Sequence, residues 1–286
     1  MSVAERRLHG SLHGSNKNYM KDVGDFSKNN YAGRNFYYGI REHAMGAILN
    51  GIGFYGLFRA SGSTFLVFSD YMRASVRVAA LSHLPINYIW THDSIGVGED
   101  GPTHQPVETV SSLRLIPNLD VMRPGDAEET AAAYVHALNR KTGPTALILS
   151  RQDLPILPGS AADKRAGSMK GAYTVVKETG DLTTIILAAG SEVSIAVEAA
   201  KKIGDGCRVV SMPCMELFEE QDGAYQADVL SDKTKTIAVE AGVSSLWYKY
   251  ADKVLGVDSF GESAPAQFVF EAKGITVDNI VKTAKA

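Results

Sequence analysis

Short apolar runs alternate with amphipathic stretches along the first half of the chain. The runs are typical of buried strands, and the stretches have the period of about 3.6 residues that is typical of helices. The strand patterns cover residues 64–68, 85–90 and 145–149, and the helical patterns cover 42–55, 71–82 and 126–139. This alternation, from about residue 36 to 155, predicts a parallel sheet with helices on its faces.

The same alternation returns after an interruption. From Leu154 to about Gly171 the chain is rich in Pro, Gly, Ala, Lys and Ser and has no periodicity, which is typical of a linker. Further strands are predicted at 183–189, 207–212 and 236–240. We therefore expect two parallel-sheet α/β domains, one over residues 1–155 and a smaller one over 171–286, joined by a linker over 156–170.

Composition narrows the class of protein. The chain has 286 residues, of which 45% are hydrophobic and 21% charged, as in a soluble globular protein. The net charge of −3 argues against a nucleic-acid surface, which needs clustered Lys and Arg. No apolar window is long enough to span a bilayer, and the first residues lack the apolar core of a signal peptide, so we expect no membrane contact and a cytoplasmic location. Cys207 and Cys214 have no histidine nearby, so no metal site is predicted.

The segment 91–106 carries the densest candidate chemistry. It holds His92, His104, three carboxylates and three glycines directly after the strand predicted at 85–90. Ligands bind at the carboxyl ends of strands in open α/β sheets, and histidines exchange protons near neutral pH. A surface turn with two hydrogen-bonded histidines is the simpler interpretation of such a pair, but the whole stretch favours a reactive site.

Two further features have both a structural and a functional interpretation. Glu42 stands at the start of a predicted helix, where the helix dipole favours a carboxylate whether or not it has a function. Phe65, Phe68 and Tyr71 follow one another at a spacing of three, which is typical of core positions on a helix. Where a strand runs into a turn, the same three side chains could instead form an aromatic wall for a flat ring.

Taken together, four segments resemble transketolase. They are Gly39–Ile48, Gly62–Arg73, the loop 91–106 and Leu149–Gln152, and the likeness runs from about Gly14 to the last residues, including Phe260–Pro265. The resemblance implies a thiamine-diphosphate pyrimidine-binding domain followed by the smaller transketolase C-terminal domain. It also implies transfer of a two-carbon ketol unit between sugar phosphates in the pentose phosphate pathway.

The resemblance assigns a cofactor role to four residues. Glu42 matches the carboxylate that bonds to the aminopyrimidine of thiamine diphosphate and so acts in catalysis. Phe65, Phe68 and Tyr71 match the aromatic pocket around the pyrimidine. The chemistry itself belongs to the cofactor, and the protein contributes position and electrostatics.

Five residues match the substrate side of the family. His92 and Asp100 match groups that contact hydroxyls of the sugar, and His104 matches a histidine that assists proton transfer. Arg151 and Ser15 match phosphate-binding positions, where a guanidinium fork suits a phosphate dianion.

One part of the family pattern is not matched. A whole transketolase carries, ahead of these segments, a diphosphate-binding domain that holds Mg²⁺, and this sequence has no such domain. The stretch 10–16 also lacks an Asp of the family pattern, so residues 1–13 are interpreted as a foreign or miscalled start. We expect the second subunit of a split transketolase or a truncated remnant, inactive by itself, which forms a homodimer or a complex with a diphosphate-binding chain.

Two alternatives remain from the sequence. A related thiamine-dependent half, such as a deoxyxylulose phosphate synthase or the β-subunit of a 2-oxoacid dehydrogenase, shares the domain architecture, and fold alone does not decide. A non-catalytic interaction module would keep the surface for self-association and lose the chemistry. The entry 91–94 and the aromatic trio favour transketolase over the related enzymes. A pure interaction module would have no physical need for the site residues together, which are Glu42, His92, Asp100, His104 and Arg151.

Overall fold

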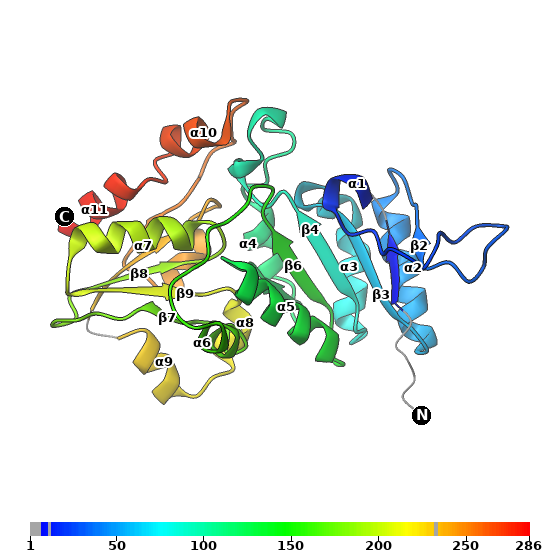
Figure 1. Cartoon of the computed structure of the whole chain (residues 1–286), viewed down its shortest axis with the longest axis horizontal. Helices are drawn as coiled ribbons and strands as arrows, with labels where there is room; N and C mark the ends of the chain where they lie inside the picture. The colour runs from blue at the N-terminus through cyan, green and yellow to red at the C-terminus, as the bar shows by residue number, and fades with distance from the viewer. Residues whose placement is uncertain (1–6, 11–12, 232–233) are drawn as a thin grey trace.

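The computed structural model describes residues 7–10, 13–231 and 234–286. It contains two β-sheets, one built from strands β1 to β6 and the other from β7 to β11. Figure 1 shows the two sheets following one another along the long axis of the molecule, each with helices packed against it. We call the part that carries the first sheet the first domain and the part that carries the other the second domain.

The first sheet is parallel throughout, in the order β2-β1-β3-β4-β6-β5. Its strands are β1 (Arg7–Gly10), β2 (Asn35–Phe36), β3 (Arg59–Phe65), β4 (Asn87–Thr91), β5 (Asp120–Met122) and β6 (Thr145–Leu149). The helices of this domain are α1 (His13–Asn16), α2 (Glu42–Tyr55), α3 (Arg73–Leu81), α4 (Thr109–Arg114) and α5 (Ala127–Asn139), with 3-10 helices η1 (Leu66–Met72) and η2 (Ile95–Asp100).

Both faces of the first sheet are covered by helices. On β4, Tyr88 and Trp90 pack with α2, α3 and α4, whereas Ile89 packs on the opposite face with α5 and with α8 of the second domain. The alternation follows from the two-residue repeat of a strand. Burial on both faces explains why 85–90 and 145–149 are mostly apolar rather than alternating apolar and polar.

The second sheet has the order β11-β10-β8-β9-β7, in which β7 is antiparallel and the other pairs are parallel. Its strands are β7 (Tyr173–Val176), β8 (Thr184–Ala188), β9 (Cys207–Ser211), β10 (Lys235–Val239) and β11 (Lys253–Leu255). The helices from the linker onward are α6 (Ala161–Ser168), α7 (Glu192–Ile203), α8 (Met215–Glu219), α9 (Gly223–Val229), η3 (Ser245–Lys249), α10 (Ala266–Ala272) and α11 (Val277–Lys285). Helices α7 and α11 pack on one face of this sheet, and α8, α9 and η3 pack on the other.

Several predicted elements are confirmed. The helix predicted over 42–55 is α2, and the strand predicted over 145–149 is β6. Asp126 caps α5, because its carboxylate accepts the backbone N–H groups of Glu128 and Glu129, both at 2.9 Å. The expected class, two parallel-sheet α/β domains, is confirmed apart from the single antiparallel strand β7.

The strand predicted over 64–68 is wrong. The strand β3 spans Arg59–Phe65, and the apolar run continues as the 3-10 helix η1. The small residues in the middle of β3 gave no apolar signal, yet they are needed for packing. A Cβ on Gly62 would lie only 2.6 Å from Cδ1 of Leu49, so the small residue lets α2 approach the sheet closely.

The predicted linker contains a helix that anchors it. Within residues 156–170, α6 buries Lys164, whose ammonium donates to a carboxylate oxygen of Asp126 at 2.6 Å and to the carbonyl oxygen of Leu157 at 2.9 Å. The Asp126 carboxylate also accepts the N–H of Leu157 at 3.1 Å. Polar composition hid this helix, because its main anchor is a buried ion pair rather than an apolar stripe.

Candidate active site

His92 stands immediately after β4, where the sheet ends. Its backbone has φ +63°, a conformation that side chains other than Gly seldom adopt, and the residue is buried. Its ring Nδ1 lies 2.9 Å from Oγ1 of Thr91, which donates its hydroxyl proton to Oδ1 of Asn16 at 2.7 Å. Asn16 in turn donates to Oγ of Ser63 at 2.8 Å. Because the hydroxyl has one proton, Nδ1 carries the ring proton of neutral His92 and Nε2 is left as an acceptor.

Charged groups gather around this imidazole. The pKa of His92 is lowered to about 4, first because burial disfavours the imidazolium and second because Arg151 adds positive charge nearby. Asp100 and Asp93 act in the opposite direction, and His104 lowers the pKa further. His92 is therefore neutral at physiological pH, within electrostatic reach of three of the residues that the sequence singled out.

Phe65, Phe68 and Tyr71 form a column of rings. Neighbouring centroids in the column are 6.1 Å apart, with interplanar angles of 13° and 22°. Residues three apart eclipse one another on a 3-10 helix, so η1 aligns the rings of Phe68 and Tyr71, and Phe65 precedes η1 directly. The Phe65 ring also stacks on His92, with centroids 3.6 Å apart. The spacing of three therefore produces an aromatic column at the carboxyl ends of β3 and β4.

His104 closes one side of this column. Its ring lies edge-on to Phe68 at 5.4 Å and to Phe65 at 6.5 Å. Its Nδ1 lies 2.9 Å from Oγ1 of Thr103. Asp100 ends η2 and is exposed.

Glu42 is the first residue of α2 and is half-buried. The helix that carries it packs against β3 and η1. Its next residue, His43, places Nδ1 3.1 Å from Oγ of Ser75 on α3. A Cβ on Gly46 would come within 2.7 Å of Cβ of Ser75, so α2 and α3 are in close contact. The start of α2 is thereby fixed against α3, the helix that follows η1.

A cavity of about 500 Å³ opens on the other side of His92. Ser15, His92 and Arg151 all line it, together with the residues that begin α5 and those that follow β6. Glu42, Asp100, His104 and the aromatic column do not line it. Phe65 stacks on His92, so the column and His104 lie beside one wall of the cavity, whereas Glu42 is carried by the helix that packs against η1. Among the residues described, the cavity lining and the aromatic column with His104 thus form two groups that meet at His92.

Sequence reasoning missed Arg123, which lies behind the loop at the interface between the domains. Its guanidinium contacts Asp93 at 2.8 Å, Glu192 at 2.5 Å and Glu240 at 3.4 Å, all fully buried. Glu240 also pairs with Arg114 at 2.7 Å. The nearest signal in the sequence was Glu240, at the end of the strand predicted at 236–240, where packing or an interface is the simpler interpretation; Glu240 does lie in this interface.

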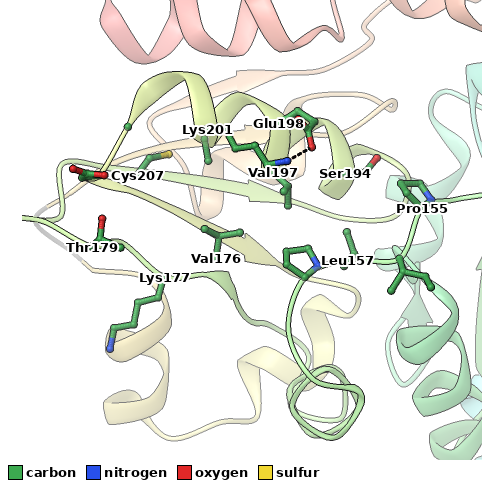
Figure 2. Close-up of a pocket in the computed structure, with 15 residues that line it drawn as sticks. Pro155, Leu157, Val176, Lys177, Thr179, Ser194, Val197, Glu198, Lys201 and Cys207 are labelled. Carbon is green, nitrogen blue, oxygen red and sulfur yellow. Dashed lines mark hydrogen bonds and ion pairs between the residues drawn. The ribbon is translucent and has the colours of Figure 1, made fainter.

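A second groove, of about 600 Å³, lies between the linker and the second domain. Figure 2 shows Pro155 and Leu157 on one side of it and α7 on the other, with the ion pair of Glu198 and Lys201 on its rim at 2.6 Å. No predicted site residue lines this groove. Within the described ranges, no three His, Cys, Asp or Glu side chains are grouped to hold a metal ion, and no helix is long and apolar enough to cross a membrane.

Family models match both domains. Residues 6–156 match the transketolase pyrimidine binding domain, which is more than half of the chain. The chain belongs to the transketolase family. Residues 171–276 match the transketolase-like C-terminal domain. Both matches agree with the order of domains that the resemblance implied.

Curated transketolases are similar along almost the whole chain. The transketolase of Dictyostelium discoideum is 59% identical over 278 residues, and that of Physarum polycephalum is 58% identical over 280. Each alignment covers 96% of this chain and 42% of the relative. The chain therefore spans less than half the length of these transketolases.

Solved transketolases have the same fold. A Pichia stipitis transketolase in complex with xylulose 5-phosphate superposes with a TM-score of 0.94 at 41% identity, over 98% of this chain and 42% of that one. The Leishmania mexicana transketolase gives 0.93 at 46% identity over the same shares. A split-gene transketolase, described as an inactive beta4 tetramer, shares the fold with a TM-score of 0.72 at 24% identity, over 98% of this chain and 91% of that one.

Proposed function

We propose that this chain supplies the pyrimidine-binding side of a transketolase active site, and that it transfers a two-carbon ketol unit between sugar phosphates together with a diphosphate-binding region. The observation that carries this proposal is the aromatic column of Phe65, Phe68 and Tyr71 beside His92 and His104, at the carboxyl end of a parallel sheet in a transketolase chain.

The column and Glu42 suit a planar heterocycle with hydrogen-bonding edges. The 69% exposed Tyr71 leaves the outer end of the column open to a ligand, and offset rings 6.1 Å apart present apolar edges and faces. A half-buried carboxylate at the start of α2 would accept a hydrogen bond from the heterocycle. When bound, thiamine diphosphate would supply the nucleophilic carbon and the electron sink, and Glu42 would hold its aminopyrimidine.

The cavity on the other side of His92 suits a sugar phosphate. Nε2 of His92 would accept a hydrogen bond from a sugar hydroxyl, because Nδ1 is already hydrogen-bonded to Thr91. Arg151 and Ser15 would bind the phosphate at the far wall. His104 and Asp100 would contact the reacting end of the sugar, with His104 moving a proton.

The diphosphate and Mg²⁺ would be held outside the residues matched here. The chain covers 42% of its curated relatives, and its matches are to the pyrimidine-binding and C-terminal domains. We therefore propose that residues 1–286 alone give no ketol transfer. A second polypeptide, or a further region, would complete the cofactor site.

Partner binding is supported by the outer face of α2. Its exposed side chains are mostly small or apolar, and they include Ile48, Phe54 and Tyr55, which are 45%, 64% and 68% exposed. Small residues such as Ala47 and Gly51 allow a second helix to approach closely. We propose that this face contacts a second copy of the chain, because an isologous contact needs only one self-complementary surface. Light scattering tests this, since Ile48→Asp should convert a dimer into monomers.

The decisive experiment is complementation. The purified chain is mixed with the part of the Dictyostelium discoideum transketolase that it does not match, thiamine diphosphate and Mg²⁺. We expect transfer from xylulose 5-phosphate to ribose 5-phosphate by the mixture and none by either part. Turnover by the chain alone would contradict the need for a partner, and use of pyruvate would favour the related thiamine enzymes.

Glu42→Gln gives the matched test of the cofactor side. The amide has the same shape but carries no negative charge, so the complemented enzyme should lose about 100-fold or more in kcat, the scale of one catalytic proton-transfer partner. Glu220→Gln, at an exposed carboxylate in the second domain, serves as the control. A fully active Glu42→Gln assembly would remove Glu42 from the catalytic role and support a non-catalytic module.

A further inference from the structure

Gln105 joins the site loop to the last part of the chain. The side chain is buried, and its amide nitrogen donates to the carbonyl oxygen of Gly98 at 2.7 Å and to that of Glu262 at 2.9 Å. Gly98 lies within η2, and Glu262 lies in the second domain, 157 residues from Gln105. Both protons of one amide thus connect the two segments.

The two segments fit together with little space. A Cβ on Gly261 would lie 1.6 Å from Oε1 of Gln105, so only glycine fits there. Gly98 has φ +79°, and a Cβ on it would come within 3.2 Å of the backbone nitrogen of Ala266. Ser263 adds a hydrogen bond from its hydroxyl to the carbonyl oxygen of Glu99 at 2.6 Å. Residues 260–266, with α10 behind them, therefore cover the turn of the loop, as Figure 1 shows beside the α10 label.

We propose that Gln105 is a positioning residue, through which the segment 260–266 of the second domain sets the place of Asp100 and His104. This rests on the proposed function, in which those two residues contact the sugar. Gln105 is one residue from His104, and the carbonyl that it holds, that of Gly98, is two residues from Asp100. Fixing both ends fixes the short turn between them, which the N–H groups of His104 and Gln105 close by donating to the carbonyl oxygen of Gly101.

The two hydrogen bonds that Gln105 donates, which we call the clamp, require an amide side chain. Both acceptors are backbone carbonyl oxygens, so the side chain must offer two protons on one planar group. A carboxylate of the same shape offers none and would face two oxygens, which costs the full desolvation of the group. A protonated carboxylic acid offers one. Gln105→Glu should therefore break the clamp at high pH and partly restore it at low pH.

The kinetic test uses the complemented enzyme. In Gln105→Glu we expect the KM for ribose 5-phosphate to rise about tenfold or more, with a smaller change in kcat, because misplaced binding groups weaken the hold on the substrate. The loss should shrink as pH is lowered towards 5, which a general loss of structure would not produce. Gln267→Glu, the same change at an exposed position on α10, should leave both constants unchanged. An unchanged KM in Gln105→Glu would overturn the proposal.

Hydrogen exchange tests the clamp without activity. We expect the amides of Val97, Gly101 and Gln105 to lose protection in Gln105→Glu and in Gly261→Ala, while the rest of β4 keeps its protection. Gly223→Ala, where a Cβ meets open space, is the matched control for the second variant. Unchanged protection in both variants would overturn the clamp. Loss of protection in an assembly that gives no ketol transfer even as wild type would support the clamp and contradict the proposed function instead.

Discussion

Two neighbouring residues of the site loop, His92 and Asp93, have opposite surroundings. His92 faces a cavity of about 500 Å³, and among the residues that the structure describes its ring is hydrogen-bonded through Nδ1, to Thr91. Asp93 faces inward, and its carboxylate contacts the buried guanidinium of Arg123 at 2.8 Å. One side of the loop is thus left open for a ligand, and the other is bonded to Arg123, which in turn pairs with Glu192 and Glu240 of the second domain.

The inward side of the loop supports the unusual backbone of His92. A non-glycine residue at φ +63° persists only when its surroundings hold it, and His92 has such a backbone. The adjoining ion pair, which reaches Glu192 and Glu240 in the second domain, supplies that support. The open face can therefore stay open because the closed face is rigid.

Removing Arg123 should give the largest effect. Arg123→Met fills similar space but leaves three buried carboxylates with one guanidinium, that of Arg114, so we expect a loss of about 3–5 kcal/mol in the free energy of unfolding. Urea denaturation measures it. Lys201→Met, in an exposed ion pair with Glu198, should change stability by less than about 0.5 kcal/mol. Equal, small losses in both variants would show that the buried cluster does not brace the loop.

The sequence predicted an element correctly where an apolar run or an apolar stripe is what the element buries. The bounds of the helix at 42–55 came from its helical pattern, and those of the strand at 145–149 came from its short apolar run. The strand at 59–65 was misplaced because its small residues serve the close approach of α2, a tertiary need with no local pattern. The helix at 161–168 was missed because a single buried Lys anchors it, and a linear pattern cannot show a partner 38 residues away.

Truncating the aromatic column should have an intermediate effect that depends on position. Phe65 lies between His92 and Phe68, so Phe65→Ala should cost about 2–3 kcal/mol, less than full burial would give because the ring is half-exposed. Tyr71→Ala, at the 69% exposed end, should cost less than about 0.5 kcal/mol. Thermal unfolding compares them. Equal losses in the free energy of unfolding of the two variants would contradict a column that is anchored at His92 and open at Tyr71.

The sequence singled out candidate site residues one at a time and gave no sign of how they are grouped around His92. The loop's composition and the family resemblance singled out His92, and the spacing of three singled out the aromatic rings. That the rings eclipse depends on η1 being a 3-10 helix, which the apolar pattern did not distinguish from a strand. The roles of Arg123 and Gln105 depend on contacts with residues 69 and 157 positions away, so their partners appear only once the chain is folded.

The smallest expected effect is the pH dependence that His92 contributes. Its pKa of about 4 lies below the ordinary 6.5, so between these values the unfolded state binds the proton more readily than the folded state. Stability from this group is complete above pH 6.5 and is lost as pH falls, by about 1 kcal/mol at pH 5.5. His92→Asn should flatten the dependence of the free energy of unfolding on pH in this range. His83→Asn is the control, because His83 is an exposed histidine that also has a left-handed backbone, with φ +56°. Unfolding at pH 7.5, 6.5 and 5.5 measures all three proteins, and a His92→Asn curve parallel to wild type would mean that the open face of the loop does not desolvate its histidine.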